Sequence, residues 1–122
     1  MILKLSELDA RFIVRDPTAG DSGGWRDVGT SVIGIGAVEP DGVWFLCPKC
    51  FRENSGPIGT HMVICWFVGR VTDDVTPKPG RWNPVGTDID NLTFVGPGAT
   101  SVHIQGGCGA HFHVTNGTID GA

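Results

Sequence analysis

Two short stretches decide how this chain folds, Cys47-Pro48-Lys49-Cys50 and Cys108-Gly109-Ala110-His111. Each places two metal-binding side chains three positions apart, a spacing that lets the chain bend until both ligand atoms occupy adjacent corners of a tetrahedron. We therefore predict that Cys47, Cys50, Cys108 and His111 together hold one Zn²⁺ ion. Because the two stretches lie far apart in the sequence, the shared ion would close a long loop and join two hairpins.

Two further residues compete for the same ion. His61 stands at the start of the apolar stretch 61–68, where it could replace His111 or hydrogen-bond to a zinc thiolate. Cys65 lies inside that stretch, and a free cysteine there is favoured as a buried apolar residue rather than a ligand. His103 and His113 are less suited, because strand alternation turns His103 outward and gives His113 a cross-strand carboxylate neighbour.

The first stretch has a competing interpretation as a disulfide or a redox-active pair. A redox pair normally opens a helix that follows a strand, whereas residues 51–57 have the composition of a loop. This favours metal binding. With four protein ligands no position stays open for water, so a structural zinc is favoured over a catalytic one.

Length and charge narrow the possible partners. The chain has 122 residues, which predicts one domain over 1–122 with a modest core. Its formal net charge of −4 argues against a nucleic-acid partner. The start of the sequence lacks the apolar segment of a signal peptide, and no apolar run is long enough to cross a membrane. We therefore expect a reducing compartment and no membrane partner.

The remaining pattern predicts an all-β fold with little helix. Residues 3–11 suggest one helical turn capped by Ser6, and the segments 16–30 and 72–91 have the composition of loops. The stretch 61–68 is apolar on both faces, which indicates a central strand. Further strands are expected at 12–14, 31–39, 43–46, 92–95 and 101–105.

A hairpin is predicted at the carboxyl end of the sequence. Asn116-Gly117 readily supplies the two positive φ angles of a type I′ turn between residues 112–115 and 118–120. The resulting register sets Val114 opposite Ile119 and His113 opposite Asp120.

Several motifs, in this order, resemble those of a family of small uncharacterised zinc-binding proteins encoded by tailed phages and prophages. They are Leu3-Lys4-Leu5-Ser6-Glu7-Leu8, Phe45-Leu46-Cys47-Pro48-Lys49-Cys50-Phe51, Gly59-Thr60-His61-Met62-Val63-Ile64-Cys65, Pro79-Gly80-Arg81-Trp82, Asp90-Asn91-Leu92-Thr93 and Gly106-Gly107-Cys108-Gly109-Ala110-His111. The resemblance implies a phage origin and implies no activity. Cys47, Cys50, Cys108 and His111 match the family's pattern, as do His61 and Cys65. The family commonly has Trp where this chain has Ala110, and His113 is outside its motif.

Two classes of function follow from these observations. The favoured class is a non-enzymatic structural or binding protein, for example a capsid or tail accessory component. Its partners would be other phage structural proteins, and a homo-oligomer is compatible with it. The alternatives are a zinc-dependent hydrolase, which needs an open metal position, and an intracellular inhibitor of a host protein. We expect the protein in the host cytoplasm during infection and, if it is structural, in the virion.

Overall fold

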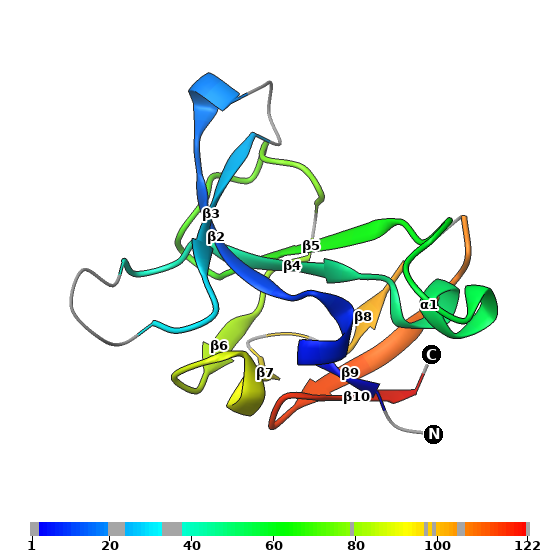
Figure 1. Ribbon diagram of the computed structural model, residues 1–122. Helices are drawn as coiled ribbons and strands as arrows, with labels where there is room; N and C mark the ends of the chain where they lie inside the picture. Colours follow the sequence, from blue (N-terminus) through cyan, green and yellow to red (C-terminus); the bar gives the residue numbers. More distant parts are fainter. Residues whose placement is uncertain are drawn as a thin grey trace.

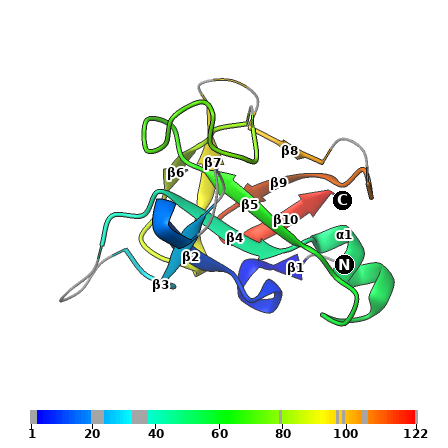
Figure 2. The same cartoon turned by 90° about the horizontal axis from the view of Figure 1, so that it is seen from above.

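The computed structural model describes residues 3–19, 24–32, 38–78, 80–96, 98, 100–104 and 107–121 (Figures 1 and 2). These residues form two four-stranded antiparallel sheets and one two-stranded sheet, with a single α-helix in the described ranges. The prediction of an all-β fold with little helix is confirmed. The strands are β1 (Leu3–Lys4), β2 (Arg11–Arg15), β3 (Trp25–Gly29), β4 (Gly42–Leu46), β5 (Met62–Trp66), β6 (Asn83–Val85), β7 (Thr93–Val95), β8 (Val102–His103), β9 (His111–Thr115) and β10 (Thr118–Gly121). The helix is α1 (Pro48–Asn54), and short 3₁₀ turns are η1 (Leu5–Leu8), η2 (Pro17–Ala19) and η3 (Ile89–Asn91).

The first sheet has the strand order β3-β2-β4-β5, so β5 is an edge strand. The prediction of a central strand at 61–68 is therefore wrong. The stretch is apolar on both faces because one face packs in the main core and a loop covers the other. That loop places Val75 against Trp66 and accepts the indole N–H of Trp66 at the Thr76 carbonyl oxygen, 2.8 Å away.

The second sheet has the order β1-β10-β9-β8 and contains the predicted hairpin. Asn116 and Gly117 have φ angles of 48° and 75°, as a type I′ turn requires. Val114 faces Ile119 and His113 faces Asp120, which confirms the predicted register. The turn itself is anchored, because Leu5 N–H donates to the Gly117 carbonyl and Gly117 N–H donates to the Leu92 carbonyl.

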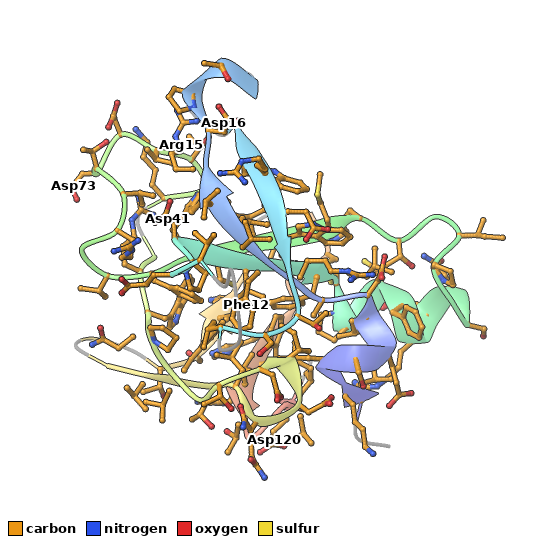
Figure 3. All side chains as sticks on the ribbon, turned by 60° about the vertical axis from the view of Figure 1, so that its left-hand side comes forward. Phe12, Arg15, Asp16, Asp41, Asp73 and Asp120 are labelled. Carbon is orange, nitrogen blue, oxygen red and sulfur yellow. The ribbon has the colours of Figure 1, made fainter. Side chains whose placement is uncertain are left out.

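The two four-stranded sheets share one hydrophobic core. Phe45 of β4 and Phe112 of β9 meet edge to face with ring centroids 5.9 Å apart, and Phe12 lies near the centre of the molecule (Figure 3). Cys65 is fully buried in this core, which confirms its interpretation as an apolar residue. Trp82 stacks on Phe94 and packs against the same core, so the two-stranded sheet β6-β7 adds a third wall.

Several sequence-based boundaries need correction. The expected loop 16–30 contains η2 and β3, and the expected loop 72–91 contains β6 and η3. Strand β3 forms in spite of its polar composition because it pairs with β2 and its Trp25 packs on Trp44. The amino-terminal turn is 3₁₀ and follows Lys4 rather than Ser6. The expected strand 31–39 falls largely on residues 33–37, which lie outside the described residues.

Replacement of Gly117 by Val should destabilise the protein by roughly 2–4 kcal/mol, since a β-branched residue is strained at positive φ. A Cβ atom at this position would also collide with the carbonyl oxygen of Asp90. Thermal unfolding followed by circular dichroism measures the change. Gly98→Ala is the matched control, because nothing lies within 4 Å of a Cβ there. Equal melting temperatures for the two variants would contradict the role of this turn.

Candidate metal centre

Four metal-binding side chains converge where the two large sheets meet. Cys47 directly follows β4, Cys50 lies in the first turn of α1, His61 directly precedes β5, and Cys108 lies in the β8–β9 connection. The pairing of β4 with β5 explains half of the arrangement. Leu46 pairs with Met62, so the next pair outward brings Cys47 to His61, and Cys47 N–H donates to the His61 carbonyl over 2.8 Å.

The four ligand atoms all lie within 4.8 Å of one another. Cys47 Sγ is 3.7 Å from Cys108 Sγ, and Cys108 Sγ is 3.5 Å from His61 Nε2. The sulfur–sulfur distance is far longer than the bond of about 2.05 Å in a disulfide, and all four cysteines of the chain are free thiols. Cys47 is buried whereas His61 is exposed, so the cluster opens to solvent on its histidine side. These residues are placed to hold a metal ion.

Hydrogen bonds from the surrounding residues fix the cluster. Lys49 Nζ donates to the Cys108 carbonyl oxygen over 2.7 Å, which ties α1 to the β8–β9 connection. His61 Nδ1 lies 3.2 Å from the Met62 carbonyl oxygen. Because a carbonyl only accepts, this contact requires the proton on Nδ1 and leaves the lone pair of Nε2 directed at the sulfurs.

The three thiols differ in how readily they ionise. Burial raises the pKa of Cys47 to about 12, and burial followed by the Cys108 contact raises the pKa of Cys50. Burial also acts to raise the pKa of Cys108, but hydrogen bonds from the Ala110 backbone and contacts with the neighbouring side chains outweigh it and lower the pKa to about 7. A cation among these sulfurs would hold all three as thiolates, because a coordinating thiol is deprotonated.

His111, the expected fourth ligand, lies outside this cluster. Ala110 is turned into the core and is only 1% exposed, so strand alternation turns His111 outward at the start of β9. Its ring stacks on His103 with centroids 4.6 Å apart, and its Nε2 lies 3.0 Å from Ser101 Oγ. The structure thus brings together Cys47, Cys50 and Cys108 with His61, which the sequence offered only as an alternative ligand.

The segment after Cys50 is helical rather than a loop, which corrects the expectation for residues 51–54. Pro48 is the first residue of α1, a position that suits its fixed φ angle, and Ser55 ends the helix in a left-handed conformation. The strand–turn–helix order of a redox pair is therefore present. The case for metal binding now depends on the third thiol and the imidazole, which a redox pair does not need.

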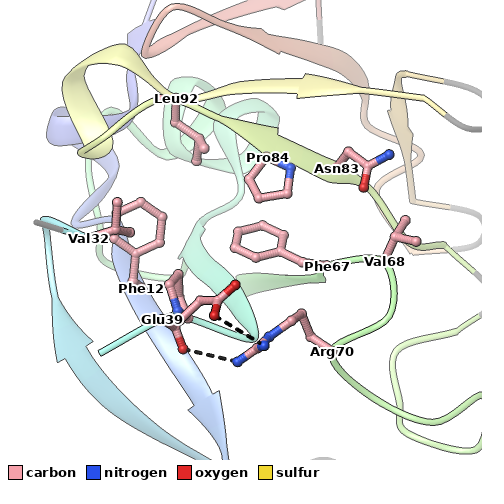
Figure 4. Close-up of a pocket in the computed structure, with 11 residues that line it drawn as sticks. Phe12, Val32, Glu39, Phe67, Val68, Arg70, Asn83, Pro84 and Leu92 are labelled. Carbon is pink, nitrogen blue, oxygen red and sulfur yellow. Dashed lines mark hydrogen bonds and ion pairs between the residues drawn. The ribbon is translucent and has the colours of Figure 1, made fainter. Parts of the chain in front are cut away.

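A separate hollow of about 610 Å³ lies between β2 and the β6–β7 hairpin (Figure 4). Phe12, Phe67 and Leu92 give it an apolar lining. Arg70 at its rim is paired with Glu39 over 3.5 Å and with Asp41 over 3.0 Å, so its charge is already balanced. The hollow contains no cysteine or histidine, and the reactive side chains are at the metal centre instead.

No family model, curated protein or solved structure matches this chain. Within the described residues, no helix has the length and apolar character needed to cross a membrane. The assignment of a function therefore depends on the geometry of the metal centre and on the surface around it.

Replacement of His61 by Ala should weaken metal binding by more than about 100-fold, since loss of an outer hydrogen-bond partner alone costs about 10–100-fold. His111→Ala should leave the affinity within a few-fold of the unchanged protein. Competition with a chromophoric chelator measures both. A larger loss in His111→Ala than in His61→Ala would restore the ligand set expected from the sequence.

Proposed function

We propose that this chain binds one structural zinc ion through Cys47, Cys50, His61 and Cys108. The observation that carries the proposal is the fit of two distances between ligand atoms. In a tetrahedral zinc site with Zn–S of about 2.3 Å and Zn–N of about 2.05 Å, two sulfurs lie about 3.8 Å apart and a sulfur and a nitrogen about 3.6 Å apart. The corresponding separations here are 3.7 Å and 3.5 Å.

The ligand types favour zinc over the commoner hard cations. Thiolates and imidazole suit Zn²⁺, whereas Mg²⁺ and Ca²⁺ take oxygen ligands. Three cysteines and one histidine form one of the usual structural zinc sets, which occupy all four tetrahedral positions. A hydrolase would need one position free for water, so the complete set favours a structural ion.

The ion would act as a clamp between the two sheets. Three ligands come from the continuous segment that ends β4, forms α1 and begins β5, and the fourth comes from the β8–β9 connection. Cys47 and Cys108 are 61 positions apart, so the clamp closes a long loop and restricts the unfolded chain. Metal binding of this kind contributes directly to the free energy of folding.

We further propose that the zinc-clamped domain is a non-enzymatic, phage-encoded protein that functions while bound to a protein assembly such as the virion. The resemblance of its motifs to the phage family supports the origin. The surface beside the metal supports binding, since Ile58 is 90% exposed and Met62 is 51% exposed. The loop that presents Ile58 is held by hydrogen bonds from Asn54 to Thr60 and from Thr60 to the Gly56 carbonyl. Single exposed apolar residues are common on protein surfaces, so the support comes from two such side chains on one fixed segment, which together could form a small contact surface.

The purified protein should contain close to one zinc ion per chain. Cys108→Ser should lose the metal and most of the thermal transition, because the zinc binding energy is largely folding energy. Cys65→Ser is the matched control: it should cost about 1–3 kcal/mol through a buried hydroxyl and still retain the zinc. Elemental analysis measures the zinc content of both variants, and calorimetry measures their thermal transitions. Equal zinc loss in the two variants would show that the ligand set is different.

The binding role predicts that the chain is present in purified virions. Ile58→Asp should lower its copy number there at least several-fold while the zinc content stays at one per chain. Val85→Asp is the control, because Val85 is 54% exposed but lies on β6, away from the metal centre. Quantitative mass spectrometry of dissolved particles measures the copy number. A chain that accumulates in infected cells and is absent from virions would instead favour the inhibitor or enzyme alternatives.

A further inference from the structure

The histidines that the zinc centre does not use are all gathered in one place. The chain has four histidines, and only His61 belongs to the cysteine cluster. The other three, His103, His111 and His113, lie on the neighbouring strands β8 and β9. From this arrangement we propose a second metal site, made of imidazoles, on the outer face of the β1-β10-β9-β8 sheet.

Strand register places these three side chains on the same face. His103 pairs directly with His111 across the two strands, and directly paired residues project to the same side of a sheet. His113 follows His111 by two positions and therefore projects to that side as well. The burial pattern agrees, since all three are exposed while Val102, which precedes His103, and Phe112, which lies between His111 and His113, are buried in the core.

The spacing of these histidines suits chelation of a single ion. His103 and His111 already stack with ring centroids 4.6 Å apart, and ligand nitrogens on one metal ion lie about 3.3 Å apart when each bond is about 2.05 Å. In the present side-chain positions the ligand atoms of these three histidines do not form a group within 4.8 Å, so metal binding requires the exposed rings to rotate toward one another. His113 stands one strand repeat away, about 6.6 Å along β9, and its ring would turn toward the His103–His111 pair.

The surroundings favour a cation at this position. Asp120 of β10 pairs directly with His113 and is exposed, so its carboxylate adds a negative neighbour on the same face. Ser101 Oγ, which now contacts His111 Nε2 over 3.0 Å, would be displaced from that nitrogen when the metal binds.

The ligand type defines which ions this site takes. Imidazole suits Zn²⁺, Ni²⁺ and Cu²⁺, and three imidazoles leave further positions to water. The second site is therefore open and exchangeable, in contrast to the closed cysteine site. Its ion would bind and leave without unfolding the protein, because the three histidines contribute little to the core.

Nickel is the probe for this site. The 122-residue chain, holding its zinc, is titrated with Ni²⁺ at neutral pH, and bound nickel and retained zinc are measured by equilibrium dialysis with elemental analysis. We expect one nickel ion per chain with the zinc unchanged. The paramagnetic ion should broaden the imidazole resonances of His103, His111 and His113 and leave that of His61 sharp.

His103→Ala and His113→Ala should each weaken nickel binding at least tenfold while the zinc content stays at one per chain. The matched control is Thr115→Ala, an exposed position on the same face of β9, which should bind nickel unchanged. Retained zinc in each variant shows that the fold is intact. Nickel that replaces zinc one for one, or nickel affinity in the histidine variants equal to that of the unchanged protein, would overturn the second site.

Discussion

The structure depends on the convergence of three sulfurs and one imidazole nitrogen at the end of the β4–β5 pair. Cys47 is buried beside two other thiols, and its pKa of about 12 shows how costly a bare thiolate is there. A divalent ion held by these groups would remove that cost by neutralising the charge, and would at the same time join β4, α1 and β5 to the β8–β9 connection. The same four groups therefore determine both the charge balance and the connection between the two sheets.

A second constraint secures the opposite end of the shared core. The Asn116-Gly117 turn accepts a hydrogen bond from Leu5 and donates one to Leu92, so it links the amino-terminal segment to the chain that leads into β7. Between the two ends, Phe45 and Phe112 pack directly across the sheets. The loop that exposes Ile58 begins at the end of α1 and ends at the start of β5. The cysteine cluster and the pairing with β4 hold these two elements in place, so the loop between them is fixed.

Local signals in the sequence were sufficient for the hairpin at residues 112–120 and for the burial of Cys65, because turn chemistry and side-chain alternation depend on near neighbours. They were insufficient for β3 and β6, whose sequences are polar or contain Pro84 and whose strands exist only through their partners. They also predicted a central position for β5, which is an edge strand. An edge strand whose outer face is covered by a loop has the same apolar pattern as a central strand. Spacing alone selected the three cysteines that the structure brings together, whereas their binding of a metal, the identity of that metal and the family resemblance stay predictions.

The choice between His61 and His111 shows what spacing leaves undetermined. Cys108 and His111 have the same three-residue separation as Cys47 and Cys50, but α1 turns Cys50 back toward Cys47 whereas β9 carries His111 outward. Two side chains that are three positions apart point to the same face of a helix but to opposite faces of an extended strand. His61 was placed instead by the register of β4 with β5, a long-range fact that no local motif contains. The structure gathers three thiols and one imidazole in one cluster and leaves the other three imidazoles exposed. Under the two proposals, Cys108 within the β8–β9 connection would hold a tightly bound ion, and the His103–His111 pair at the base of the same connection would hold an exchangeable one, with no ligand shared between them.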